Sequence, residues 1–247
     1  MPVPPTSGRS RTMKRAAAGA LALVLLYLAV AYLLVPALWR EDARRHPAWA
    51  AAPRITHTGD GIPGDPLNVA LVGTEAEVKK LLVAAGWYPA DPLTLESCLE
   101  IAEASVLKRP YADAPVSNLF LFGRKQDLAF EQPVGDSPRK RHHVRFWKGD
   151  QPGPAGRPVW FGSATFDEHV GLSHTTGQVT HHIAPDLDAE RDHLVGTLDR
   201  TGGVAEAFTV PGFHKTLEGR NGGGDPWRTD GSLSVVVVRP AGPTPRP

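Results

Sequence analysis

The hydrophobic pattern separates one long apolar run near the start of the chain from a longer region of short segments. Residues 16–39 contain no charged side chain, and Arg40 and Glu41 follow them directly. As a helix rising about 1.5 Å per residue, this run spans about 36 Å, which exceeds the roughly 30 Å core of a bilayer. The pattern predicts one transmembrane helix over residues 16–39, preceded by a basic segment over residues 1–15.

The residues in and around the apolar run indicate whether it is cleaved as a signal peptide and which way it crosses the membrane. A cleavable signal peptide is the alternative interpretation, with Ala29-Val30-Ala31 as the cleavage site, but the run continues past this site to Trp39. Four basic residues precede the run without an acid, and three follow it beside Glu41 and Asp42. By the positive-inside rule, this small excess favours a cytoplasmic N-terminus and an extracytoplasmic domain at the cell membrane.

Beyond the apolar run, the pattern predicts a linker, one domain and a tail. Residues 40–63 show no periodicity and are expected to be a linker, residues 64–238 a folded domain, and the Pro-rich residues 239–247 a disordered tail. Thr74-Glu75-Ala76-Glu77 has the sequence of a capping box. The apolar residues after it recur at helical spacing as far as Gly86, which predicts the first helix of the domain.

Two further helices and several strands complete the predicted domain. Helices are expected from Leu95 to Leu107 and from Asp186 to Gly202. Short alternating or wholly apolar runs predict strands at residues 68–72, 119–122, 127–132, 142–147, 159–167, 179–183 and 232–238, the second and third of which are expected to form a hairpin. The order of these elements predicts an α+β domain with a mostly antiparallel sheet and about three packed helices.

Charge and cysteine content exclude several classes of protein. The chain has 27 Lys and Arg residues against 26 Asp and Glu residues, whereas nucleic-acid-binding domains usually carry a clear basic excess. Nucleic acid is therefore not an expected partner. Cys98 is the single cysteine, so neither an intrachain disulfide nor a cysteine-rich zinc site can form. We expect Cys98 to be a small apolar residue on the predicted second helix.

Histidines concentrate in the second half of the chain, where two His-His pairs fall on predicted strands. Successive side chains on a strand point to opposite faces. This alternation predicts one polar face that gathers His143, Arg145, Thr165, Asp167, Thr180 and His182. A histidine beside a carboxylate is suited to general acid–base catalysis, so His143, Asp167 and His182 are the candidate catalytic residues. Arg145, Thr165 and Thr180 are the candidate substrate-binding residues, because a guanidinium binds carboxylates and phosphates.

Structural interpretations compete with this chemistry. The outward face of an antiparallel sheet is normally polar, so hydrogen-bonded histidines without a catalytic role are the simpler interpretation of both pairs. Neither His-Glu-x-x-His nor His-x-His occurs, so no metal ligands and no cofactor are assigned, and His169 and His174 are expected in a loop. Asp186 is expected to cap a helix. The segment Asn221–Asp225 is expected to form a turn with Asx hydrogen bonds, with calcium or anion binding as the alternative.

Eight segments of the sequence have a combination of residues that is specific when taken together. They are Gly64 to Asn68, Ala114 to Ser117, Leu121 to Phe130, Arg141 to Arg145, Thr165 to Asp167, Thr176 to Ile183, Asp186 to Arg191 and Gly219 to Trp227. Together they resemble the LssY C-terminal domain family over residues 64–238. The resemblance implies a cell-envelope context, since some relatives carry DedA-type or lipid-phosphate phosphatase modules. It implies no defined reaction, because the phosphatase motifs themselves are absent from this sequence.

These observations favour a membrane-anchored cell-envelope protein with an accessory or ligand-binding role. Its expected partners are the lipid bilayer, through residues 16–39, and an envelope or membrane protein. The alternative is an envelope hydrolase acting on an anionic or phosphorylated substrate, with His143, Asp167 and His182 as acid–base groups and Arg145 holding the anion.

Overall fold

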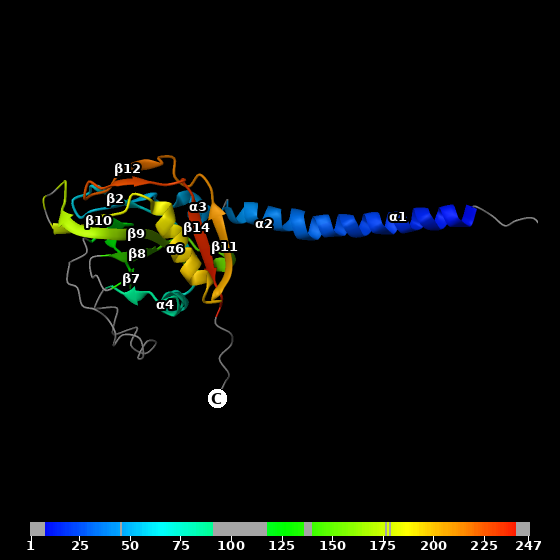
Figure 1. The fold of residues 1–247 in the computed structure, drawn as a ribbon, viewed down its shortest axis with the longest axis horizontal. Coiled ribbons are helices and arrows are strands. Elements are labelled where there is room, and N and C mark those ends of the chain that lie inside the picture. Colours follow the sequence, from blue (N-terminus) through cyan, green and yellow to red (C-terminus); the bar gives the residue numbers. More distant parts are fainter. Residues whose placement is uncertain are drawn as a thin grey trace, which may run out of the picture. The chain divides into compact units, whose positions relative to one another are not determined.

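The computed structural model describes residues 8–44, 46–90, 118–135, 140–175, 177 and 179–240. The chain divides into two compact units, Met1–Arg45 and His46–Pro247 (Figure 1). Three predicted features lie wholly or largely outside the described residues: the helix from Leu95 to Leu107, Cys98 on it, and the C-terminal tail.

The first unit is a continuous run of helix. It consists of α1 (Gly8–Ala29), a π-helical turn η1 (Val30–Leu34) and α2 (Val35–Arg44). The π turn ends two residues before Pro36, which lacks the N–H that would bond the carbonyl of Tyr32 in a regular α-helix. The span Met13–Leu38 has 26 residues and contains an 18-residue window with a mean hydropathy of 2.6. By length and composition it can cross a membrane, a property that signal sequences share.

The second unit is built on an eight-stranded sheet. Its strands are β3 (Val69–Val72), β4 (Tyr88–Pro89), β7 (Leu128–Pro133), β8 (Arg141–Lys148), β9 (Val159–Leu172), β10 (Val179–Ile183), β11 (Val204–Val210) and β14 (Leu233–Val238). They follow the order β11-β14-β3-β9-β8-β7-β4, with β10 also paired to β9. Among these pairs β14 and β3 are parallel and the others antiparallel. The predicted α+β class with a mostly antiparallel sheet is confirmed.

Two helices cover one face of this sheet, and both begin where the sequence predicts. The helix α4 (Glu75–Ala84) starts with a complete capping box formed by Thr74 and Glu77. The helix α6 (Leu187–Asp199) is capped by Asp186, whose carboxylate accepts a hydrogen bond from the backbone N–H of Ala189. In Figure 1, α6 crosses the sheet, and it contacts β9 and β14. The core beneath the helices includes Leu71, Leu82, Phe130, Phe146, Trp160, Leu194 and Leu198.

The other face of the large sheet is covered by the helix α3 (Pro47–Ala51) and a small sheet. The small sheet has the order β2-β1-β5-β6, with β1 (Ile55–His57), β2 (Pro63–Pro66), β5 (Phe120–Leu121) and β6 (Arg124–Lys125). A separate pair joins β12 (Glu218–Arg220) to β13 (Pro226–Arg228). The second core lies here and includes Trp49, Leu67, Leu119, Leu121, Trp147, Phe161 and Leu233.

The start of the folded unit and the pairing of one predicted hairpin differ from the prediction. The second unit begins at His46 rather than residue 64, because Trp49 is 1% exposed and packs edge-on against Phe161, with ring centroids 6.0 Å apart. Elements of three to five residues are too short to show a periodicity, which is why this segment resembled a linker. The predicted hairpin over residues 119–132 also differs: β5 pairs with β6, whereas β7 joins the large sheet.

Candidate functional site

Alternate residues of β8 and β9 place a polar cluster on the face covered by the small sheet. In register, His143 lies opposite Thr165 and Arg145 opposite Ser163, so these side chains share one face with Asp167. All five are buried. The structure therefore brings together four of the six predicted site residues: His143, Arg145, Thr165 and Asp167.

A pocket of about 390 Å³ opens against this cluster, and we refer to it as the site pocket. Elements far apart in the sequence form its wall. Its polar lining includes Asp65 from β2, Arg145 from β8, Thr165 and Asp167 from β9, His181 from β10, and Asn221 from the turn between β12 and β13. Phe120 and Ile183 add apolar surface. Such a mixture of apolar surface and converging polar groups is typical of small-molecule sites.

Arg141 organises the charges behind the pocket wall. Its guanidinium donates hydrogen bonds to Glu131 on β7 (Nη1–Oε2, 2.9 Å) and to Asp167 on β9 (Nε–Oδ2, 3.1 Å). A third hydrogen bond goes to Nε2 of His181 on β10, at 2.9 Å. The same network leaves Nδ1 of His181 only 3.3 Å from Oδ2 of Asp167. One buried cation thus links four neighbouring strands.

Burial and this cation set the protonation of the cluster. Burial raises the pKa of Asp167 to about 6, and the nearby charges of Arg141 and Arg145 oppose that rise. Burial, together with the nearby charges of Arg141 and Arg145, lowers the pKa of His181 to about 4. At neutral pH His181 is therefore uncharged, and its Nε2 accepts the hydrogen bond from Arg141. Arg145 faces Asp65, with 3.7 Å between Nη1 and Oδ2.

His143 is fully enclosed within the cluster. It is 1% exposed, and burial together with Arg145 and Arg141 lowers its pKa well below the usual value. Within the described residues, neither of its ring nitrogens has a hydrogen-bond partner. The hydroxyl of Thr165, which lies opposite His143, also has no partner there. Buried polar atoms are rarely left without a partner, so each such atom in a native structure calls for an explanation.

The structure does not bring His182 to this cluster. On the hairpin of β9 and β10, His182 pairs with His169 but Ile183 pairs with Asp167, so Glu168 is an extra residue in β9. Such a bulge reverses the alternation, because paired residues of an antiparallel ladder share a face. The prediction assumed unbroken alternation, and His181 takes the place it gave to His182. Thr180 pairs with Gly171, and its side chain lies outside the described residues.

His182 belongs instead to a second polar group. Its Nδ1 lies 2.5 Å from Oδ1 of Asp225, and among the described residues His174, His182 and Asp225 form a group with ligand-type atoms within 4.8 Å of one another. Asp225 is held by the predicted Asx turn, since Oδ1 of Asn221 accepts hydrogen bonds from the backbone N–H groups of Gly223 and Asp225. Sequence reasoning did not predict this group. The sequence singles out His182 as a candidate site residue and calcium binding as an alternative for Asn221–Asp225, but nothing in it joins the two.

The remaining histidine of the first pair serves the core on the opposite face. As predicted, His142 lies on the apolar side of β8, where its ring stacks on His193 with centroids 3.7 Å apart. Its Nδ1 is 2.7 Å from Oε2 of Glu190. Burial raises the pKa of Glu190 to about 9 and lowers the pKa of His142. Both groups are therefore neutral at pH 7, and Glu190 donates the hydrogen bond.

Comparison with known proteins identifies the domain. A family model described as LssY C-terminus matches residues 49–233. The match begins at Trp49, which agrees with a domain that starts in α3. No curated protein and no solved structure matches the chain.

We predict that replacing Arg141 costs far more stability than replacing a surface arginine. Arg141→Ala leaves Glu131 and Asp167 buried without their cation and should lower the free energy of unfolding by about 3–5 kcal/mol. Arg228→Ala is the matched control, since the ion pair of Arg228 with Asp186 is exposed and contributes about 0–1 kcal/mol. Urea denaturation followed by circular dichroism measures both values, and equal losses would contradict the network.

We also predict a pH-dependent stability difference between the wild type and Glu190→Gln. The folded pKa of Glu190 lies above its unfolded value, so its stabilising contribution is complete below about pH 4.5 and is lost as pH rises towards 9. Glutamine can still donate to His142 but does not ionise. From pH 5 to pH 8 the wild type should lose on the order of 1–3 kcal/mol relative to Glu190→Gln in urea denaturation. His142 is present in both proteins, so its own titration largely cancels, and parallel profiles would refute the assignment.

Proposed function

The chain belongs to the LssY C-terminus family, and we propose that it is a membrane-anchored protein of the cell envelope whose folded domain binds a small polar ligand in the site pocket. One observation carries this proposal. Thr165 lines the pocket, and its buried hydroxyl has no hydrogen-bond partner within the described residues. The same holds for both ring nitrogens of His143, which pairs with Thr165 on the adjacent strand. A ligand that supplies hydrogen-bonding groups at this wall would satisfy polar atoms that burial otherwise penalises.

The lining of the pocket limits the chemistry of the ligand. Asp65 and Asp167 present carboxylate oxygens, whereas Arg145 presents a cation and Asn221 an amide. A wall with charges of both signs suits a molecule that carries donors and acceptors together, such as a polyol, a sugar derivative or a zwitterion. Phe120 supplies an apolar surface for the body of such a ligand.

The N-terminal helix supports the location. In this proposal the span Met13–Leu38 is an uncleaved anchor, and the basic excess before it favours a cytoplasmic N-terminus and a folded domain outside. Anchoring restricts the domain to the neighbourhood of the membrane, where its ligand or its partner is an envelope component.

A hydrolase is the second candidate, favoured by one contact. His181 Nδ1 lies 3.3 Å from Asp167 Oδ2 at the pocket wall, so a histidine and a carboxylate are close enough to share a proton with a bound water or substrate. In this alternative His181 takes the acid–base role that the sequence assigned to His182. Arg145 would hold the anionic group of the substrate.

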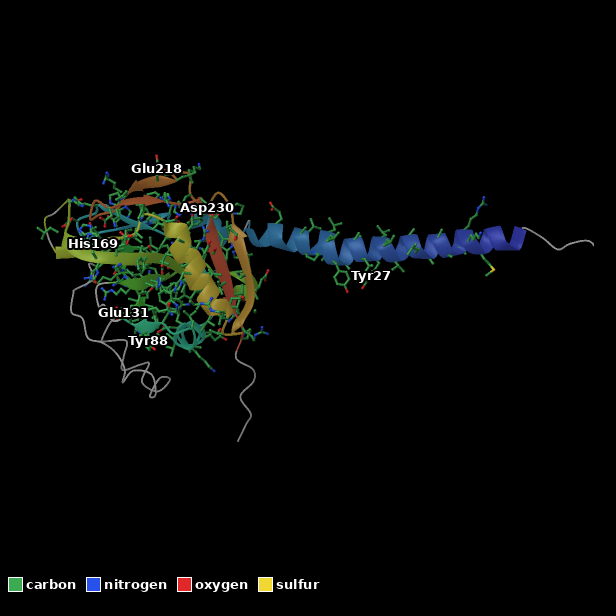
Figure 2. All side chains as sticks on the ribbon, viewed as in Figure 1. Tyr27, Tyr88, Glu131, His169, Glu218 and Asp230 are labelled. Atoms are coloured by element: carbon green, nitrogen blue, oxygen red, sulfur yellow. The ribbon has the colours of Figure 1, made fainter. Side chains whose placement is uncertain are left out.

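Blocking the pocket tests the binding proposal. Asn118 lines the pocket with an exposed side chain, so Asn118→Trp should fill the entrance without disturbing the core. Glu218→Trp adds the same ring on β12, where Figure 2 shows Glu218 at the surface. Thermal unfolding of the detergent-solubilised chain is measured with sugars, sugar phosphates, polyols and amino acids. We expect at least one compound to raise the midpoint in the wild type and Glu218→Trp but not in Asn118→Trp. A panel that leaves all three proteins unshifted, or shifts all three equally, would count against a ligand in this pocket.

A separate assay tests the hydrolase alternative. Chromogenic phosphate and carboxylic esters are incubated with the wild type, with Asp167→Asn and with Asp127→Asn, whose carboxylate lies on the surface. Hydrolysis by the proposed pair requires wild-type turnover that falls by about 100-fold or more in Asp167→Asn and persists in Asp127→Asn. Turnover that is absent, or that survives Asp167→Asn in a folded protein, removes this alternative and leaves the binding proposal intact.

A further inference from the structure

His174, His182 and Asp225 come from three separate segments and meet beside the site pocket. His174 lies in the turn after β9, His182 on β10, and Asp225 in the turn between β12 and β13. Each offers one ligand-type atom, and these atoms lie within 4.8 Å of one another. Two imidazoles and a carboxylate form the donor set of metal sites that keep an open position for water or substrate.

Hydrogen bonds hold two of the three side chains in place before any ion arrives. Nδ1 of His182 contacts Oδ1 of Asp225 at 2.5 Å, and Oδ2 of Asp225 accepts a hydrogen bond from the backbone N–H of Ile183 at 3.2 Å. These contacts hold the carboxylate and the ring side by side, so an ion bound between Nδ1 and Oδ1 would replace the proton that they share. The backbone N–H of His174 donates to the carbonyl of Gly223 at 2.9 Å, which ties the two turns together.

Two glycines keep the space around the imidazoles open. A Cβ added to Gly171 would lie 2.8 Å from Nε2 of His182, so a side chain there would push the His182 ring out of its position beside Asp225. A Cβ at Gly224 would lie 2.7 Å from Cβ of His174, and the φ of +88° at Gly224 also disfavours any other residue. These two positions are occupied by the residue type that the cluster requires.

The cluster has a buried side and an open side. His182 and Asp225 are 6% and 4% exposed, whereas His174 is exposed. Ligands of a tetrahedral zinc ion lie about 3.3 Å from each other, since each is about 2.0–2.1 Å from the ion. The ligand-type atoms of the cluster are up to 4.8 Å apart, and rotation of the exposed His174 ring can bring its nitrogen closer to the other two. His169, also exposed, stacks on His182 with ring centroids 4.7 Å apart at the end of the domain where β10 lies (Figure 2).

We propose that His174, His182 and Asp225 bind a divalent transition-metal ion of the zinc class. The neighbours of these residues in the chain, Ser173, His181, Ile183 and Gly223, line the site pocket. A bound ion would therefore fasten the turn after β9 to the turn between β12 and β13 and fix the part of the pocket wall that they form. This site is distinct from the buried cluster of Arg141 and Asp167 and does not depend on the ligand proposed for the pocket.

Zinc binding by the full chain in detergent tests this inference. The protein is stripped with a chelator and titrated with Zn²⁺ by calorimetry, beside His174→Ala and the control His57→Ala, which removes an exposed histidine of β1. We expect one ion per chain in the wild type and in His57→Ala, and a loss of affinity of about 100-fold or more in His174→Ala. Zn²⁺ should also raise the thermal midpoint of the first two proteins, because an ion that binds only the folded state stabilises it.

His174 is exposed, so His174→Ala should fold like the wild type, and the metal-free melting curves verify this. Asp225→Asn provides a second variant that keeps the shape of the side chain but removes its charge, and it should also weaken binding. A wild type that binds no Zn²⁺, or equal affinities in His174→Ala and His57→Ala, would overturn the site.

Discussion

The buried guanidinium of Arg141 is the interaction on which the polar half of the domain depends. It joins Glu131 on β7, Asp167 on β9 and His181 on β10 while its own strand, β8, runs between them. Removing charges from water is costly, and a buried arginine is tolerated only when its donors are satisfied. Here three acceptors from three strands satisfy it. The strands must therefore keep their relative register, and the pocket wall is held in one arrangement.

That constraint explains how one face of a sheet serves two purposes. Towards one end, Trp147 and Phe161 form an apolar core beneath the small sheet. Further along the same strands the side chains become Arg145, Thr165 and Asp167, and the space above them opens into the site pocket. The apolar end stabilises the layer packing, and the polar end forms the wall of the proposed binding site. The small sheet forms part of the pocket wall, since Asp65 of β2 and Phe120 of β5 line it, and the family match from residue 49 includes this sheet.

The histidine pairs show that neighbouring residues can have separate roles. His142 and His143 lie on opposite faces of β8, one stacked in the helical core and one in the polar cluster. His181 and His182 are separated in the same way, one beside Asp167 and the other beside Asp225. Each pair therefore supplies two different sites. The simpler interpretation, a hydrogen-bonded histidine without a catalytic role, fits His142. By contrast, His143, His181 and His182 lie beside charged or polar groups that could take part in binding or catalysis.

The sequence by itself determined the features that depend on local pattern. The apolar helix, the capping box at Thr74, the cap at Asp186, the turn at Asn221 and the mostly antiparallel α+β class all follow from residues close together in the chain. Strand alternation also placed His143, Arg145, Thr165 and Asp167 together, because β8 and β9 are regular where they pair.

Only the tertiary structure decided which residues meet across the fold. The extra residue Glu168 reverses the alternation of β9 and brings His181, not His182, to Asp167, and one inserted residue leaves no periodic signal. Asp65 reaches Arg145 from a strand too short to be recognised. The group of His174, His182 and Asp225 depends on two turns that lie about fifty residues apart in the chain and are joined by hydrogen bonds. Such contacts depend on strand register and on the packing of distant segments, which the pattern of neighbouring residues does not determine.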